Sequence, residues 1–143
     1  GYADANSTEF DPQTTHNVID MMEAQKQMVN KGGSMRLGAY PCRLKKGSKV
    51  EQIYSPLLKD GSDIIYERHR HRYEFNHDYQ ADFEQHGMEC VGINPESGLV
   101  EILCLQNHPW YIGVQFHPEY SSTVLHPHPL FVDFVKAATK VNL

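Results

Sequence analysis

The residues best suited to acid–base chemistry are a histidine and a carboxylate two positions apart, His117 and Glu119, with Pro118 between them. They follow an apolar run, 110–116, whose composition predicts a buried central strand. Histidine can act as a general base near neutral pH, and a nearby carboxylate can fix its tautomer and stabilise its charged form. Catalytic groups usually lie at the carboxyl ends of strands in α/β sheets. The pair alone does not establish catalysis, because a histidine beside an acid is more often structural.

A second unusual stretch, residues 67–74, reads E-R-H-R-H-R-Y-E. If it is extended, its period of two places three arginines on one face and two histidines on the other. These residues are Arg68, Arg70 and Arg72, and His69 and His71. Three guanidiniums cannot share a buried face without acids, which favours one arginine facing a ligand carboxylate or a paired acid. A solvated strand whose arginines pair with Glu67 and Glu74 fits the composition equally well.

The nine histidines raise the possibility of a metal site, through H-x-H pairs at His69 and His71 and at His126 and His128. A zinc or iron site needs three or four convergent ligands. Arginines flank the first pair, and prolines interleave the second. We therefore predict no native metal site.

The glycine-rich stretch 32–38, G-G-S-M-R-L-G, carries Arg36 and could be a loop beside an anionic ligand or a plain connection. The sequence contains neither G-x-x-x-x-G-K-[ST] nor G-x-G-x-x-G. Cys42, Cys90 and Cys104 form no C-x-x-C pair and lack the glycines of a nucleophile turn. They are interpreted as reduced core thiols, which favours a cytoplasmic location.

The 143 residues fit one domain, and the net charge of −5 offers no positive field for nucleic acid or an anionic membrane. No apolar run is long enough to span a bilayer. Periodicity and turn residues predict extended segments at 40–44 and 63–75, a short helix at 50–54, a helix at 78–85 capped by Asp78, a hairpin of 88–93 with 99–105, and a final helix begun by Pro129. The run 18–22 fits either a strand or a helix. Strands mixed with helices predict an α/β fold.

Several stretches, taken together, resemble one family: N-S-T-E-F at 6–10, G-G-S-M-R-L-G, E-R-H-R-H-R-Y-E, N-H-P-W at 107–110, Q-F-H-P-E at 115–119 and H-P-L-F at 128–131. Q-F-H-P-E is typical of class I glutamine amidotransferases, and the arginine run narrows the resemblance to the CTP synthase family. The resemblance implies the C-terminal portion of a mostly parallel open sheet with flanking helices and an antiparallel hairpin, truncated at the N-terminus. Residues 1–143 are then a partial glutamine amidotransferase domain.

By the same resemblance, His117 is the base that activates a cysteine nucleophile, and Glu119 is the acid that orients it. Glu9 holds the α-amino group of glutamine, and Arg72 holds its α-carboxylate. The family's nucleophile lies in a G-x-C-x-G turn that this sequence does not contain, so we expect the chain alone to be inactive.

The resemblance also implies a parent ligase of pyrimidine biosynthesis that converts UTP to CTP with ATP and Mg²⁺, activated by GTP. The partners of this segment are then L-glutamine and a synthetase domain of the same chain, in a parent that forms homo-oligomers. Three alternatives stay open: a non-catalytic amidotransferase-like binding or regulatory module, a histidine-rich metal protein, and another class I amidotransferase.

Overall fold

The computed structural model describes residues 1–21, 35–59 and 61–140. The strands are β1 (Ala5–Ser7), β2 (His16–Met21), β3 (Arg36–Leu44), β4 (Ile64–His71), β5 (Tyr73–Phe75), β6 (Met88–Ile93), β7 (Val100–Leu105) and β8 (Ile112–Val114). The α-helices are α2 (Lys49–Tyr54), α3 (Gln80–Gln85) and α4 (Pro129–Lys140), with 3₁₀ turns η1 (His77–Tyr79) and η2 (Pro118–Ser121). The mixed α/β class is confirmed.

The strands form two sheets, a five-stranded sheet in the order β4-β3-β6-β7-β8 and a small sheet in the order β1-β2-β5. Every pairing in the five-stranded sheet is antiparallel, and among the described strands only β1 and β2 pair in parallel. The prediction of a mostly parallel sheet is therefore wrong. Short connections such as residues 94–99 can join only antiparallel neighbours, because a parallel crossover needs a dozen or more residues.

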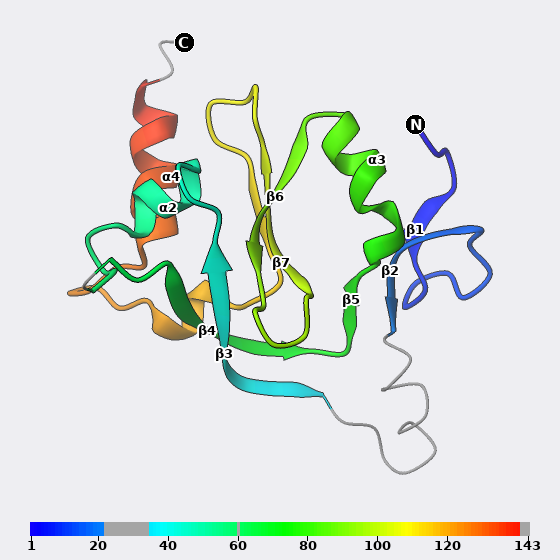
Figure 1. Cartoon of the computed structure of the whole chain (residues 1–143), viewed down its shortest axis with the longest axis horizontal. Helices are drawn as coiled ribbons and strands as arrows, with labels where there is room; N and C mark the ends of the chain where they lie inside the picture. The colour runs from blue at the N-terminus through cyan, green and yellow to red at the C-terminus, as the bar shows by residue number, and fades with distance from the viewer. Residues whose placement is uncertain (22–34, 60, 141–143) are drawn as a thin grey trace.

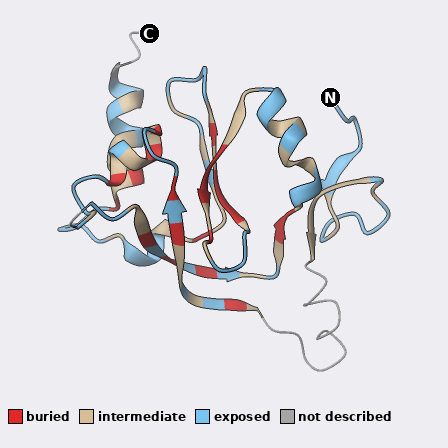
Figure 2. Ribbon diagram, viewed as in Figure 1, coloured by how far each residue is buried: buried red, intermediate tan, exposed pale blue. Residues whose placement is uncertain are grey.

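The two faces of the five-stranded sheet are covered by different layers (Figure 1). Helices α2 and α4 cover one face, while α3 and the small sheet cover the other. Buried residues follow the central strands and the sides of α2 and α4 that meet (Figure 2). The larger core, on the α2 and α4 side, includes Leu44, Val50, Ile102, Phe116 and Leu130. The smaller core contains Phe75, Cys90 and Val100.

A buried polar contact holds the helical layer to the edge strand β4. Glu67 of β4 accepts a hydrogen bond from the Tyr54 hydroxyl of α2 at 2.7 Å, and its Oε1 lies 2.8 Å from Nε2 of His128. The carboxylate of Glu67 and the imidazole of His128 are both buried. The start of α4 is thereby fixed against the sheet.

The local elements largely agree with the sequence patterns. The short helix α2 begins after Ser48, whose side chain accepts from the Glu51 backbone N–H. The hairpin of β6 and β7 is present, with Asn94 Oδ1 accepting from two backbone N–H groups of its turn. The ambiguous run 18–22 is a strand up to Met21, and Met22 lies outside the described residues.

Two predictions about local elements are wrong. The 110–116 run supplies an edge strand of three residues, Ile112–Val114, rather than a central one. Its apolar residues pack in several directions, since the Trp110 ring contacts Phe134 of α4 while Phe116 enters the core. The 78–85 helix is split into η1 and α3, and its cap is Asn76, whose side chain accepts from the Asp78 backbone N–H.

Candidate active site

His117 and Glu119 lie together just beyond the end of β8. The His117 backbone N–H donates to the Arg68 carbonyl of β4 at 2.9 Å, which fixes the histidine beside the edge strand. Nδ1 of His117 and Oε1 of Glu119 are 2.7 Å apart. The two residues, which are two positions apart in the sequence, are therefore in direct contact.

The contact gives each member of the pair a defined chemical state. Because a carboxylate accepts, Nδ1 of His117 carries a proton, which makes Nε2 the nitrogen that would act as a base in the neutral imidazole. The pKa of Glu119 is lowered, first by its own backbone N–H and then by the hydrogen bond from His117. The imidazole is 37% exposed, so its free Nε2 edge can reach a bound molecule. This arrangement suits a general base held by an orienting acid.

The alternation of the arginine run is confirmed, with Arg68 and Arg70 exposed and His69 buried. Arg72 is also exposed, in the bend between β4 and β5. The arginines share a solvent face, so they need no buried acids to neutralise them.

The alternative pairing of the arginines with the acids at either end of the run is wrong. Glu67 bonds to Tyr54 and His128, and Glu74 lies 3.7 Å from the guanidinium of Arg36 on β3. The two acids belong to the buried face of the run, whereas its arginines belong to the exposed face. That Arg72 binds a carboxylate stays a prediction.

Glu9 is exposed in a turn after β1, at the small sheet. Its backbone N–H donates to Ser7 Oγ at 3.2 Å. Among the described residues, no hydrogen bond or ion pair joins Glu9 to Arg72 or His117. Its role in glutamine binding stays a prediction as well.

A buried charged cluster behind the arginine run was not anticipated from the sequence. Arg36 contacts Glu101 at 2.5 Å and Glu74 at 3.7 Å, and all three side chains are nearly inaccessible. His69 Nδ1 lies 2.8 Å from His71 Nε2 and 3.7 Å from Glu101. One signal pointed to this cluster, since Glu101 is the only charged residue in the apolar strand β7.

Burial shifts the titration of this cluster. It raises the pKa of Glu74 to about 7 and that of Glu101 above its usual range, while Arg36 opposes both shifts. Burial, aided by the charge of Arg36, lowers the pKa of His69 to about 3, and burial also lowers that of His71. Both imidazoles are therefore neutral at physiological pH.

Arg36, the charged residue of the glycine-rich stretch, lies in a strand rather than in a loop. Gly32, Gly33 and Ser34 lie outside the described residues. Arg36 itself belongs to β3, where its buried guanidinium forms an ion pair with Glu101.

The three cysteines are free and buried. Burial raises the pKa of Cys90 to about 12 and raises the pKa of Cys42 and Cys104 as well. Thiols that stay protonated are poor nucleophiles, which favours a packing role for all three.

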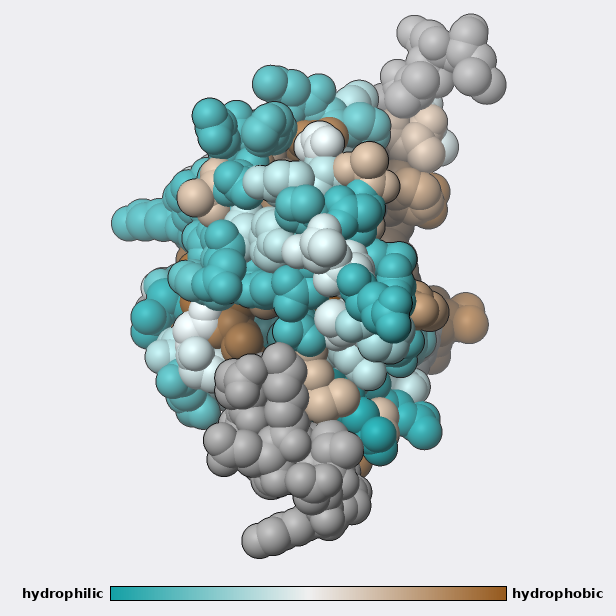
Figure 3. All heavy atoms as spheres, turned by 90° about the vertical axis from the view of Figure 1, so that its right-hand side faces the viewer, coloured by the Kyte–Doolittle hydropathy of each residue, from teal (hydrophilic) through white to brown (hydrophobic). Residues whose placement is uncertain are grey.

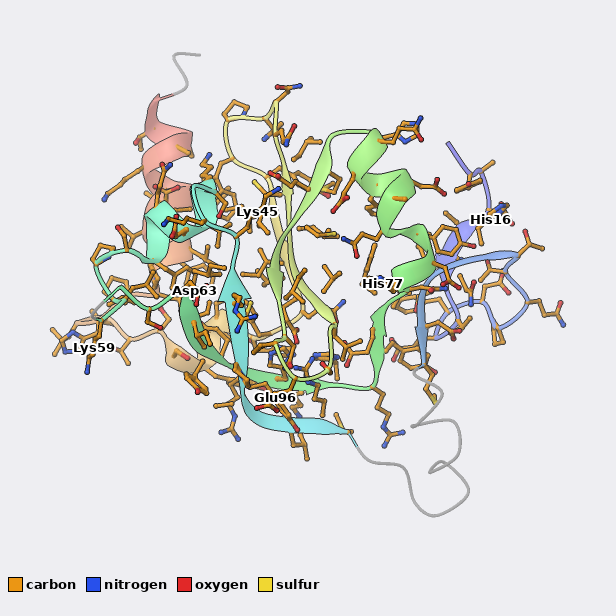
Figure 4. All side chains as sticks on the ribbon, viewed as in Figure 1. His16, Lys45, Lys59, Asp63, His77 and Glu96 are labelled. Carbon is orange, nitrogen blue, oxygen red and sulfur yellow. The ribbon has the colours of Figure 1, made fainter. Side chains whose placement is uncertain are left out.

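Apart from the contact between His69 and His71, the histidines of the described residues are spread over the molecule. His16 and His77 lie by the small sheet, on the other side of the molecule from Lys59 and Asp63 (Figure 4). His128 is buried against Glu67, whereas His126 is exposed, so this pair does not converge. Within the described ranges, no group of three or more His, Cys, Asp or Glu side chains could hold a metal ion.

The surface formed by the small sheet and α3 is largely hydrophilic (Figure 3). No helix in the described part of the chain is long and apolar enough to cross a membrane.

Comparison with known proteins gives a consistent family. The sequence model of Glutamine amidotransferase class-I matches residues 9–137. A CTP synthase of Bacteroides fragilis is 66% identical over 138 residues, which are 96% of this chain and 25% of that protein. A CTP synthase of Aquifex aeolicus is 54% identical over 137 residues, again 96% of this chain and 25% of the relative.

A solved structure gives the same result. The glutaminase domain of Trypanosoma brucei CTPS, determined with bound acivicin, matches with a TM-score of 0.85 and 36% identity over 100% of this chain and 53% of that one. The chain spans about a quarter of the length of the curated relatives it matches. This extent of sequence and structural agreement shows that the chain belongs to the class I glutamine amidotransferase family.

Proposed function

We propose that this chain is part of the glutaminase domain of a CTP synthase, which hydrolyses glutamine and supplies ammonia for the ATP-dependent conversion of UTP to CTP. The contact that supports this proposal best is the 2.7 Å approach of His117 Nδ1 to Glu119 Oε1 beside β4. The similarity to CTP synthases and to a CTPS glutaminase domain supports glutamine hydrolysis as the reaction in which this pair takes part.

In the proposed reaction, Nε2 of His117 takes the proton of a cysteine thiol that attacks the side-chain amide of glutamine. The same nitrogen then protonates the leaving ammonia, and water hydrolyses the resulting glutamyl thioester. Glu119 keeps the proton on Nδ1 and stabilises the imidazolium while it exists.

The nucleophile is not one of the cysteines of this chain in our proposal. Cys42, Cys90 and Cys104 are buried and their raised pKa values keep them protonated. We propose that the cysteine lies in another part of the parent protein and that this chain alone is inactive.

Substrate recognition is assigned to two residues. Arg72 is proposed to hold the α-carboxylate of glutamine, for which its exposed planar guanidinium offers two parallel hydrogen bonds. Glu9 is proposed to hold the α-amino group.

A synthetase domain of the parent would use ATP and Mg²⁺, with GTP as activator and within a homo-oligomer. A cytoplasmic location stays a prediction.

The triad assignment is tested in the full-length protein that contains this segment. His117→Ala should lower glutamine hydrolysis by about 10²- to 10⁴-fold, the usual contribution of a general base. Glu119→Gln should cost less, because it removes the orienting charge but leaves the base in place.

Synthesis of CTP from free ammonia provides the control, since it bypasses glutamine hydrolysis and should persist in both variants. Normal glutamine hydrolysis by the His117→Ala protein would show that the family resemblance is architectural. A non-catalytic regulatory module, the alternative function, would instead show no glutamine hydrolysis in the unmodified full-length protein.

Arg72→Lys tests recognition separately. Lysine keeps the positive charge but loses the two-pronged geometry, so the KM for glutamine should rise about tenfold while ammonia-dependent synthesis continues. An equal loss with both nitrogen sources would mean that Arg72 has a structural role.

A further inference from the structure

Arg72 is the one residue between strand β4 of the five-stranded sheet and strand β5 of the small sheet. His71 is the last residue of β4, which pairs with β3 in the five-stranded sheet. Tyr73 is the first residue of β5, which pairs with β2 in the small sheet. Figure 1 shows β4 leading directly into β5. The direction in which Arg72 projects therefore depends on how the chain turns at this bend.

A side chain spans the bend. Nδ1 of His71 lies 3.1 Å from the backbone carbonyl oxygen of Tyr73, so the imidazole bridges the two residues that flank Arg72. A carbonyl can only accept, which places the proton on Nδ1 of His71. Nε2 of His71 must then accept, and its partner at 2.8 Å is Nδ1 of His69. Two neutral imidazoles thus form one directed chain of hydrogen bonds that ends on the bend.

The surrounding residues restrict movement of the His71 ring. Its side chain is 15% exposed, and Nδ1 also lies 3.5 Å from Oε1 of Glu74. Arg36 is the register partner of His71 on β3 and holds Glu74 and Glu101 in the same cluster. An imidazole enclosed in this way can hold the bend in one conformation.

We propose that His71 is a positioning residue for Arg72, which it holds in the bend between β4 and β5 through the hydrogen bond from Nδ1 to the Tyr73 carbonyl. The inference rests on the proposed role of Arg72 in binding the α-carboxylate of glutamine. His71 does not touch the substrate in this arrangement. His71 instead fixes the conformation of the backbone from which the Arg72 guanidinium reaches the substrate.

Two substitutions separate this role from general stabilisation of the cluster. In His71→Asn the amide nitrogen takes the place of Nδ1 and can still donate to the Tyr73 carbonyl. In His71→Gln the amide takes the place of Nε2, which keeps the contact to His69 and loses the one to Tyr73. If His71 acts through Arg72, His71→Asn should therefore impair glutamine binding less than His71→Gln.

The experiment measures glutamine-dependent and ammonia-dependent CTP formation in the full-length protein. His71→Gln should raise the KM for glutamine about 3- to 10-fold, the effect of one lost hydrogen bond, with little change in kcat. His71→Asn should stay within about twofold of the unmodified protein. Combined with Arg72→Lys, His71→Gln should add little further loss, because both changes impair the same contact.

In the His71 variants, three results would overturn the inference: an unchanged KM in His71→Gln, an equal rise in both variants, or a parallel loss of ammonia-dependent synthesis. A raised KM in Arg72→Lys alone would refute His71 positioning and keep the proposed function. An unchanged KM in Arg72→Lys would refute the role of Arg72 and the inference with it.

The tautomer offers a measurement that does not depend on a variant folding. Imidazole ¹⁵N shifts of His71 should report a proton on Nδ1 and none on Nε2. The opposite tautomer would contradict the bridge to Tyr73.

Discussion

At the scale of single residues, Glu74 has the most unusual environment. Its side chain is nearly inaccessible between Arg36, His71 and Glu101. Burial raises its pKa from 4.5 to about 7, Glu101 adds to the rise, and Arg36 opposes it. A buried ion pair compensates the loss of hydration only in part, so the folded protein favours a protonated Glu74.

This predicts a pH-dependent effect of Glu74→Gln on stability. Between pH 4.5 and about 7 the folded state binds more protons at Glu74 than the unfolded state. The contribution of Glu74 to stability is therefore complete below pH 4.5 and is lost as the pH rises through about 7. Glutamine does not titrate, so the variant should gain about 2 to 3 kcal/mol relative to the unmodified chain between pH 4.5 and 8.

Urea unfolding of both proteins across this pH range measures the difference. His69 and His71 act in the opposite direction, because their lowered pKa values favour folding as the pH rises. Their effect is present in both proteins, so the comparison reports Glu74 together with its coupling to the neighbouring His71 and Glu101. A difference in stability that is independent of pH would show that Glu74 titrates normally.

At the scale of elements, the register of β6 depends on Gly92. The pairing of β6 with β7 shifts on both sides of this residue. A Cβ at position 92 would lie 2.5 Å from Ile102 Cγ1 and 2.8 Å from Cys42 Sγ. Both neighbours belong to the larger core and have no space to withdraw. The irregularity of β6 thus brings three strands into close contact.

We expect Gly92→Ala to destabilise the chain by about 1 to 3 kcal/mol through overpacking. Gly113 of β8 is the matched control, because a Cβ there would meet no atom within 4 Å. Gly113→Ala should change stability by less than about 0.5 kcal/mol. Thermal or urea unfolding of the two variants makes the comparison, and equal effects would mean that β6 can shift to accept the methyl group.

At the scale of the whole molecule, α4 has a divided apolar face. The stripe predicted from the sequence is Leu130, Phe131, Phe134, Val135 and Ala138. Leu130 is 3% exposed in the larger core, whereas Phe131, Phe134 and Val135 are 40%, 50% and 58% exposed. The helix is amphipathic as expected, but of this stripe only Leu130 is fully enclosed by the described part of the chain.

The division predicts unequal costs for two substitutions in α4. Leu130→Ala should destabilise the chain by about 2 to 5 kcal/mol, because it leaves a cavity between α2, α4 and the sheet. Val135→Ala should cost less than about 0.5 kcal/mol in the chain alone. Urea unfolding distinguishes the two, and a large cost for Val135→Ala would show that its face is covered in solution.

The dispersal of the histidines over the molecule leads to a prediction about metal content. We expect no stoichiometric zinc or iron in chelator-free preparations, since arginines flank His69 and His71 and the other pair does not converge. Elemental analysis of the purified chain measures this. One tightly held metal ion per chain would support the alternative of a histidine-rich metal protein.

Much of the local structure could be predicted from the sequence. The hairpin turn at Asn94, the helix α2 after Ser48, the start of α4 at Pro129 and the alternation of Arg68 and His69 all depend on residues close together in the chain. Local backbone chemistry determines such features wherever the segment lies in the fold. The contact of His117 with Glu119 belongs to the same class, because two positions and a proline separate them.

The arrangement of strands and the buried cluster could be decided only by the tertiary structure. An apolar run such as 110–116 has the same composition whether it forms a central or an edge strand, so its place depended on which strands became its neighbours. Arg36, Glu74 and Glu101 come from β3, β5 and β7, and although Glu101 stands out as a charge in an apolar strand, nothing local indicates that the three meet. Their shifted pKa values and the bridge of His71 across the Arg72 bend exist because packing removes water from groups distant in sequence.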